Sequence, residues 1–132
     1  MPRPEKPDRQ PPKLTEYELP GGWIVLAGHS DRDNDALSIK LANPNDWWFH
    51  VRGMPGSHVI LRVPQGEEPD NATVKAAAAI AAWHSRKREA KQVGVSATRA
   101  RFVTKPRGAK PGTVEIRKEK VLKVRPAIPS PE

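Results

Sequence analysis

Apolar residues along the chain occur in short runs. These runs are separated by polar segments that contain glycine and proline. The run Trp23–Gly28 (W-I-V-L-A-G) ends at a glycine and predicts a strand. Four further runs predict strands in the same way, at residues 46–52, 57–63, 92–103 and 113–124. Residues 53–56, between the runs 46–52 and 57–63, include two glycines and a proline, so we expect a hairpin there.

The spacing of two leucines predicts a short helix over residues 36–42. Leu37 and Leu41 stand four positions apart, so they share one helix face. Asp35 is the expected N-cap, because its carboxylate can accept hydrogen bonds from the first backbone amides. The polar residues 30–35 are expected to form a turn before this helix.

A second, longer helix is predicted from Asp70 or Asn71 to about Ala90. It contains seven alanines between Ala72 and Ala82, which are strong helix formers with little bulk. Ile80 and Trp83 are three positions apart and are expected to face the core. Four basic residues are expected in its last turn, where cations suit the helix dipole: Arg86, Lys87, Arg88 and Lys91.

These elements predict an α+β fold. We expect a single domain over residues 21–125, in which the long alanine-rich helix packs on an antiparallel sheet and the short helix lies near the N-terminal side. About 105 residues suffice for one modest hydrophobic core. Residues 1–20 carry six prolines and few apolar side chains, and residues 126–132 carry three more prolines. Both ends are therefore predicted to be disordered tails.

The hairpin register brings polar side chains onto one face. A pairing of Val51 with Ser57 across the loop sets the register, and His50 then faces His58. Alternation predicts that the core face carries Trp47, Phe49, Val51, Val59, Leu61 and Val63. The opposite face is expected to be exposed and to carry Asp46, Trp48, His50, His58 and Arg62.

Several kinds of chemistry fit this polar face. A metal site would use His50, His58 and Asp46, and a general acid–base site would use either histidine with Asp46 orienting its ring. A hydrogen-bonded network that only fixes the hairpin is also open. We favour nucleic-acid recognition, in which Trp48 stacks on a base or sugar and Arg62 meets a phosphate.

The positive charge lies almost entirely in the C-terminal third. Residues 1–84 contain 9 basic and 11 acidic side chains, whereas residues 85–125 contain 14 basic and 3 acidic ones. A basic surface concentrates polyanions, of which nucleic acid is the commonest in the cytosol, although a solubilising surface would look similar. The chain has no cysteine, which excludes disulfides, thiolate zinc sites and cysteine nucleophiles.

No targeting or membrane segment is expected. The longest apolar run has eight residues, 76–83, whereas a membrane-spanning helix needs about 18. The N-terminus is charged and proline-rich and has no apolar stretch of the kind found in signal peptides. We therefore expect a cytoplasmic protein.

Two proline–glycine loops, at residues 53–57 and 108–112, could bring backbone amides close to a ligand. Three cations add positive charge at the second loop, which could thus hold a phosphate: Lys105, Arg107 and Lys110. The Walker A pattern is absent, and a plain turn is the simpler alternative.

Taken together, the motifs resemble the NFACT RNA-binding domain (NFACT-R) over about residues 22–125. The resemblance rests on Gly28 and on five blocks, N-D-x-L-x-x-K-x-A (34–42), D-x-W-x-H (46–50), P-G-S-H-V-I (55–60) with Arg62, the alanine-rich helix with S-R (85–86), and K-P-x-G-A-K-P-G-x-V (105–114). It implies RNA contacts at Asp46, Trp48, His50, Ser57, His58 and Arg62, and phosphate contacts at Lys105, Arg107 and Lys110.

The resemblance also implies a role. It implies binding to tRNA or ribosomal RNA at the large ribosomal subunit in ribosome-associated quality control, with neither catalytic residues nor a cofactor. Full-length members carry a larger N-terminal domain and helical segments, so this chain resembles a stand-alone bacterial member. Family tyrosines are replaced here around Trp83 and residues 96–98. Two alternatives stay open: a nucleic-acid-processing enzyme using His50, His58 and Asp46, and an adaptor that binds proteins through its proline-rich tails.

Overall fold

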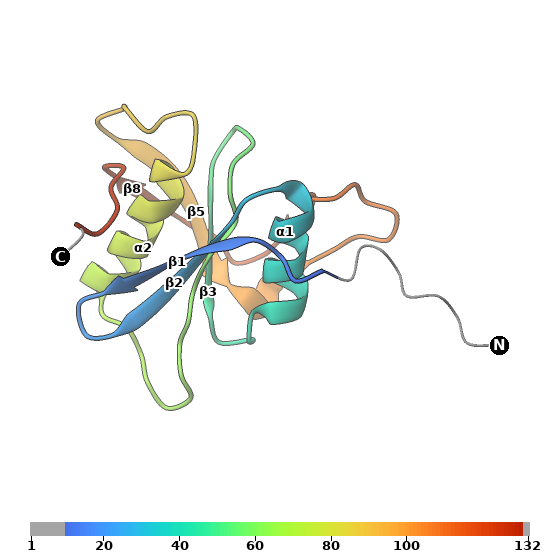
Figure 1. The fold of residues 1–132 in the computed structure, drawn as a ribbon, viewed down its shortest axis with the longest axis horizontal. Helices are drawn as coiled ribbons and strands as arrows, with labels where there is room; N and C mark the ends of the chain where they lie inside the picture. The colour runs from blue at the N-terminus through green and yellow to red at the C-terminus, as the bar shows by residue number, and fades with distance from the viewer. Residues whose placement is uncertain (1–9, 131–132) are drawn as a thin grey trace.

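Six strands form one antiparallel sheet in the order β1-β2-β4-β3-β5-β8 (Figure 1). The computed structural model describes residues 10–130. The strands are β1 (Leu14–Leu19), β2 (Trp23–Gly28), β3 (Trp47–Val51), β4 (Val59–Leu61), β5 (Val93–Arg99) and β8 (Lys120–Val124). Two short strands, β6 (Val103–Thr104) and β7 (Glu115–Ile116), pair separately. The predicted α+β class is confirmed, with helices on both faces of the sheet (Figure 1).

The hairpin register is confirmed. Trp48 pairs with Ile60 and Phe49 with Val59, which is the register that places His50 opposite His58. Most of the predicted core face lies in one hydrophobic cluster, which contains Phe49, Val51, Val59 and Leu61, with Trp47 packed against it. Val63 is also buried.

The long helix α2 (Asn71–Trp83) covers this core face. Asp70 is its N-cap, because its carboxylate accepts a hydrogen bond from Thr73 N at 2.8 Å. Its buried alanines let the helix lie close to the sheet. The predicted end near Ala90 is wrong: the Ser85 hydroxyl donates to Ala82 O and accepts from Lys87 N, so the chain turns away after Trp83.

The short helix begins earlier than predicted. Helix α1 (Asp31–Asp35) continues into a π-helical segment, η1 (Ala36–Leu41). The N-cap is Ser30, whose hydroxyl accepts from Asp33 N at 3.1 Å, so the predicted turn over residues 30–35 and the predicted Asp35 cap are wrong. This helix packs on the other face of the sheet, in a second cluster of Leu37, Trp48, Ile60 and Val103.

The last two predicted strands are each interrupted. A single 3₁₀ turn, η2 (Ala100–Phe102), follows β5, because Ala100 N donates to Asp46 O and Arg101 N to Pro44 O. Between β7 and β8 the backbone turns at Lys118, which has a φ of 56°. The short β6–β7 pair thereby lies beside η1.

The predicted tails are partly wrong. Residues 14–19 form β1, which pairs with β2 along its whole length and buries Leu19. At the other end Pro126 is buried and Ala127 N donates to Ala79 O on α2. The tail predictions for residues 1–9 and 131–132 lie outside the described residues. No helix in the described part of the chain has the length and apolar character to cross a membrane.

Candidate nucleic-acid interface

The polar face of the hairpin is buried, so the expectation that it is exposed is wrong. Asp46, Trp48 and His58 have exposed fractions of 0%, 2% and 3%, while His50 and Arg62 stay partly exposed. The covering elements are η1 and the β6–β7 pair, which supply Leu37 and Val103 to the cluster around Trp48. The predicted residues come together, but three of them lie beneath the surface.

Ser38 of η1 joins the two rings of this face. The Trp48 Nε1–H donates to Ser38 Oγ at 2.9 Å, and Ser38 Oγ lies 2.8 Å from His58 Nδ1. The Ser38 hydroxyl therefore bridges the indole of Trp48 and the imidazole of His58. The rings of Trp48 and His50 pack on His58, with centroids 5.2 Å and 5.4 Å away.

This environment keeps His58 neutral. Burial, and then the neighbouring His50, lowers the pKa of His58 to about 4, and burial also lowers the pKa of His50. A histidine with such a pKa is a weak base at pH 7. The bond to Ser38 gives His58 a structural role in the interior, which disfavours the acid–base interpretation.

Asp46 acts at the other end of the hairpin. Its carboxylate accepts from Asn43 N at 2.9 Å, from Val63 N at 2.8 Å and from Arg62 Nη1 at 3.0 Å. Arg62 Nη1 also lies 2.9 Å from Leu41 O, at the end of η1. The Asp46 carboxylate therefore stabilises the chain segments at this end of the hairpin, and it makes no hydrogen bond to His50 or His58. Within residues 10–130, no three histidine, cysteine, aspartate or glutamate side chains are grouped as a metal site requires.

The segment that leads into β4 is hydrogen-bonded to α1 and to the end of β2, through Asn34 and Gly28. Asn34 Oδ1 accepts from the backbone amide of His58 at 3.1 Å, and the Ser57 hydroxyl donates to Gly28 O at 2.6 Å. A Cβ atom on Gly28 would lie only 2.2 Å from Asn34 Oδ1, so any side chain there would have to displace Asn34. These motif residues hold the hairpin against the helix, and Ser57 is occupied as a donor.

Replacing Gly28 with alanine should therefore destabilise the fold by about 2 kcal/mol, as overpacking of a close contact does. The added methyl group must displace the Asn34 side chain from the His58 amide. Urea denaturation measures the loss. The matched control is Gly94→Ala, whose Cβ would meet Val121 at an ordinary 3.6 Å; this variant should stay within about 0.5 kcal/mol of the wild type. Equal losses in the two variants would contradict this account.

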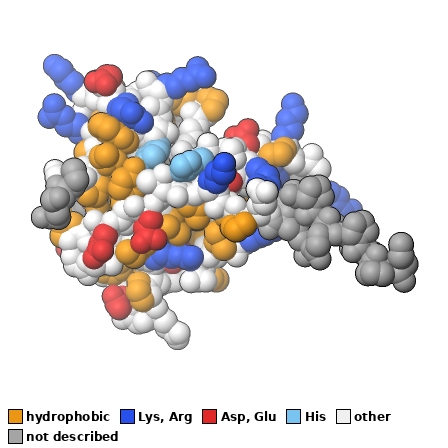
Figure 2. Space-filling view, in the orientation of Figure 1, with side chains coloured by type: hydrophobic (Ala, Val, Ile, Leu, Met, Phe, Trp, Pro, Cys, Tyr) orange, Lys and Arg blue, Asp and Glu red, His pale blue; other side chains and the backbone are white. Residues whose placement is uncertain are grey.

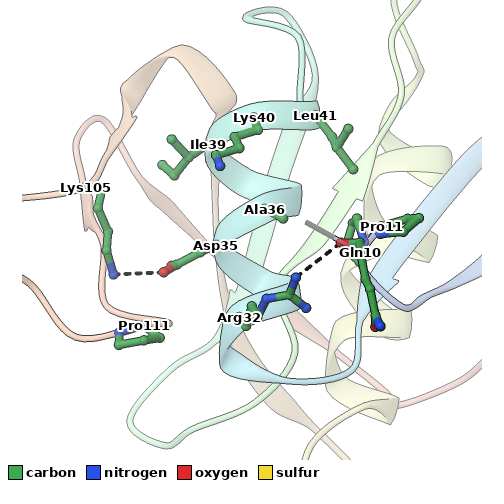
Figure 3. Close-up of a pocket in the computed structure, with 11 residues that line it drawn as sticks. Gln10, Pro11, Arg32, Asp35, Ala36, Ile39, Lys40, Leu41, Lys105 and Pro111 are labelled. Atoms are coloured by element: carbon green, nitrogen blue, oxygen red, sulfur yellow. Dashed lines mark hydrogen bonds and ion pairs between the residues drawn. The ribbon is translucent and has the colours of Figure 1, made fainter. Parts of the chain in front are cut away.

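The basic loop, residues 105–112, is held in place by Asp35 and His58. Asp35 accepts from Gly112 N at 2.9 Å and forms an ion pair with Lys105 Nζ at 3.0 Å (Figure 3). His58 makes a backbone hydrogen bond with Gly112, and Lys105 also donates to Lys110 O. Arg107 and Lys110 are exposed. The buried histidine thus connects the interior to a loop that presents cations.

An open groove of about 860 Å³ is lined by this loop, by α1–η1 and by residues 10–12. Figure 3 shows Lys105 and Pro111 on one side and Arg32, Asp35 and Lys40 on the helix. Arg32 and Lys40 were not among the predicted site residues. Lys40 belongs to the N-D-x-L-x-x-K-x-A block, so the sequence carried a signal for it; Arg32 had none. Three cations line the groove, of which Arg32 donates to Gln10 O and Lys105 pairs with Asp35. Their positive charge favours an anion in the groove.

Comparisons with known proteins show which family the chain is similar to. Residues 13–118 match the protein family described as the NFACT protein RNA binding domain. The chain is 39% identical over 115 residues to "Rqc2 homolog RqcH" of Bacillus subtilis, covering 87% of this chain and 20% of that protein. It is 37% identical over 106 residues to the protein of the same name from Streptococcus suis, covering 80% and 19%. The chain thus spans about a fifth of these relatives.

A solved structure has the same fold. It is that of the C-terminal part of the fibronectin/fibrinogen-binding protein from Streptococcus suis (FBPS), with a TM-score of 0.80 and 34% sequence identity. The similarity covers 95% of this chain and 49% of that one. The resemblance seen in the sequence is confirmed, and the chain belongs to the NFACT RNA-binding domain family.

Proposed function

We propose that this chain binds structured RNA, either tRNA or ribosomal RNA, at the large ribosomal subunit in the cytoplasm. Membership of an RNA-binding family and the similarity to RqcH support a place in translation or ribosome quality control. The observation that carries the proposal is the basic loop, which is fixed at both ends and lies beside a groove whose lining includes Arg32, Lys40 and Lys105. The role is binding rather than catalysis.

The predicted contact residues divide into two groups. Arg107 and Lys110 are exposed, and Lys105, Arg62 and His50 are partly exposed, so these five can reach RNA. The buried Asp46, Trp48 and His58, together with the hydrogen-bonded Ser57, act as positioning residues in this proposal. Trp48 would have to lose its contacts with η1 before a base could stack on it.

A loop held in one conformation binds phosphate at a lower entropic cost than a mobile one. Asp35 and Gly112 fix the base of the loop, whereas the exposed cations Arg107 and Lys110 keep their charge for a ligand. Lys105 already pairs with Asp35, so it would contribute less to phosphate binding.

Removing both exposed charges, in Arg107→Gln/Lys110→Gln, should weaken tRNA binding and make its salt dependence less steep. Each phosphate contact contributes about 0.7–0.9 to the slope of log K against log salt, so the slope should fall by about 1.5. Fluorescence anisotropy at several salt concentrations measures it. In the control Lys75→Gln/Lys123→Gln, which removes two exposed charges elsewhere, the slope should not change. An unchanged slope in the loop variant would remove the loop from the interface.

A further inference from the structure

A second group of cations lies in the turn that follows α2. Because α2 ends at Trp83, residues 84–91, here the His84 turn, are not helical. This turn carries four basic side chains and one acid, Glu89, and its cations are exposed: Arg86, Lys87, Arg88 and Lys91. Nothing in the proposed function above uses them.

The imidazole of His84 is fixed at the start of this turn. Its Nε2 lies 2.6 Å from the hydroxyl of Tyr17 on β1, and the two rings meet edge to face with centroids 5.7 Å apart. The backbone is held as well, since His84 N donates to Ile80 O at 3.0 Å and His84 O accepts from Ser57 N at 3.4 Å. Tyr17 and His84 are both partly exposed.

Arg88 is held in place near this pair by two contacts with Trp83. Its Nε donates to Trp83 O at 2.8 Å, and its guanidinium carbon lies 4.6 Å from the centroid of the Trp83 ring. Its two Nη atoms make no hydrogen bond among residues 10–130, and no acid there pairs with it. A planar, oriented guanidinium with open donors suits a phosphate, which it binds through two parallel hydrogen bonds.

The electrostatics of the pair are consistent with a site for an anion. Burial, and then the positive charge of Arg88 and the nearby His29, lowers the pKa of His84. Burial raises the pKa of the Tyr17 hydroxyl, so the ring pair is uncharged at pH 7. Arg88 therefore provides positive charge beside two neutral, partly exposed rings, the combination that binds a nucleotide through phosphate and base.

We propose that the His84 turn is a second RNA-contact site. The Arg88 guanidinium takes a backbone phosphate, and the His84–Tyr17 pair lies against the unpaired nucleotide attached to it. The inference rests on the proposed function and extends the RNA path beyond the basic loop. Figure 2 shows histidine side chains in the middle of one face, with Lys and Arg groups on both sides.

The conservative variant Arg88→Lys tests this site. It keeps the charge but removes the donor to Trp83 O and the planar fork, so tRNA should bind about 3- to 10-fold more weakly at about 150 mM salt. The slope of log K against log salt should be unchanged.

Arg88→Gln should weaken binding further and lower this slope by about 1. Lys87→Gln, which removes a charge from the same turn without any planar contact, should have a smaller effect than Arg88→Gln. Urea denaturation checks that all three variants fold.

The outcomes separate this site from the proposed function. If Arg88→Lys binds tRNA as the wild type does, while Arg88→Gln and Lys87→Gln weaken binding equally, the turn is only a diffuse positive surface and the second site is overturned. The basic loop can still pass its own test in that case. If the wild-type chain does not bind tRNA or ribosomal RNA, the proposed function fails and the second site fails with it.

Discussion

Replacing Trp48 with alanine is expected to destabilise the fold by about 3–5 kcal/mol, the usual loss when a buried aromatic ring is removed. The indole is 2% exposed and packs with Leu37, Ile60 and Val103, so its removal leaves a cavity between the sheet and η1. Ser38 also loses its donor. Urea denaturation followed by far-UV circular dichroism measures the change. RNA binding should fall only as far as the folded fraction falls.

Trp48→Phe separates stability from recognition. The variant keeps an aromatic ring in the cluster but loses the hydrogen bond to Ser38, which should cost about 1–2 kcal/mol. Its folded form should bind tRNA within about twofold of the wild type, since Trp48 is a positioning residue. A variant that is folded yet binds RNA more than about tenfold more weakly would show that Trp48 contacts RNA itself.

Acidification should weaken the fold through His58. The pKa of its imidazole is about 4 in the folded chain and about 6.5 when unfolded, so the unfolded state binds more protons between these values. Stability from this group is therefore complete above pH 6.5 and is lost as the pH falls towards 4. The loss amounts to about 3 kcal/mol between pH 7 and pH 4, and denaturation at a series of pH values measures it.

His58→Gln supplies the control for this pH dependence. Its side chain can still hydrogen-bond with Ser38 but does not titrate, so the difference in stability between wild type and variant should shrink by about 3 kcal/mol on acidification. NMR titration of the wild-type imidazole gives an independent test that requires no variant. A His58 pKa near 6.5 in the folded protein would contradict the burial described above.

The hairpin could be predicted because alternation leaves one consistent register. Phe49, Val59 and Leu61 must share the core face, and a slip by one residue would expose them. The same alternation could not tell whether Trp48 and His58 on the opposite face are exposed. That depends on Ser38 and Leu37, which come from a separate helix and form the covering cluster.

Element ends were harder to predict because single side chains decide them. Ser30 starts α1 five residues before the expected first turn, and Ser85 ends α2 seven residues before Ala90. The strand at residues 14–19 was hidden because prolines dominate the composition of residues 1–20. It forms because β2 offers an edge with which it can pair.

The candidate site was predictable in part. The charges of the basic loop can be read directly from residues 105–112. The role of Asp35 could not, because its carboxylate meets Gly112 only after the chain has crossed the sheet, 77 residues later. The His84 turn was missed for a related reason: its cations were assigned to a helix that ends at Trp83.

The measurement that tests the central claim most directly is a competition experiment at about 150 mM salt. The chain is bound to labelled tRNA or a ribosomal RNA fragment and is challenged with unlabelled duplex DNA of equal phosphate content. We expect the RNA to stay bound, with at least about tenfold preference over DNA, because a fixed loop and groove recognise more than charge alone. Equal competition by RNA and DNA, with both released together as salt rises, would contradict the proposed function. It would show that the basic C-terminal third of the chain is only a non-specific electrostatic surface.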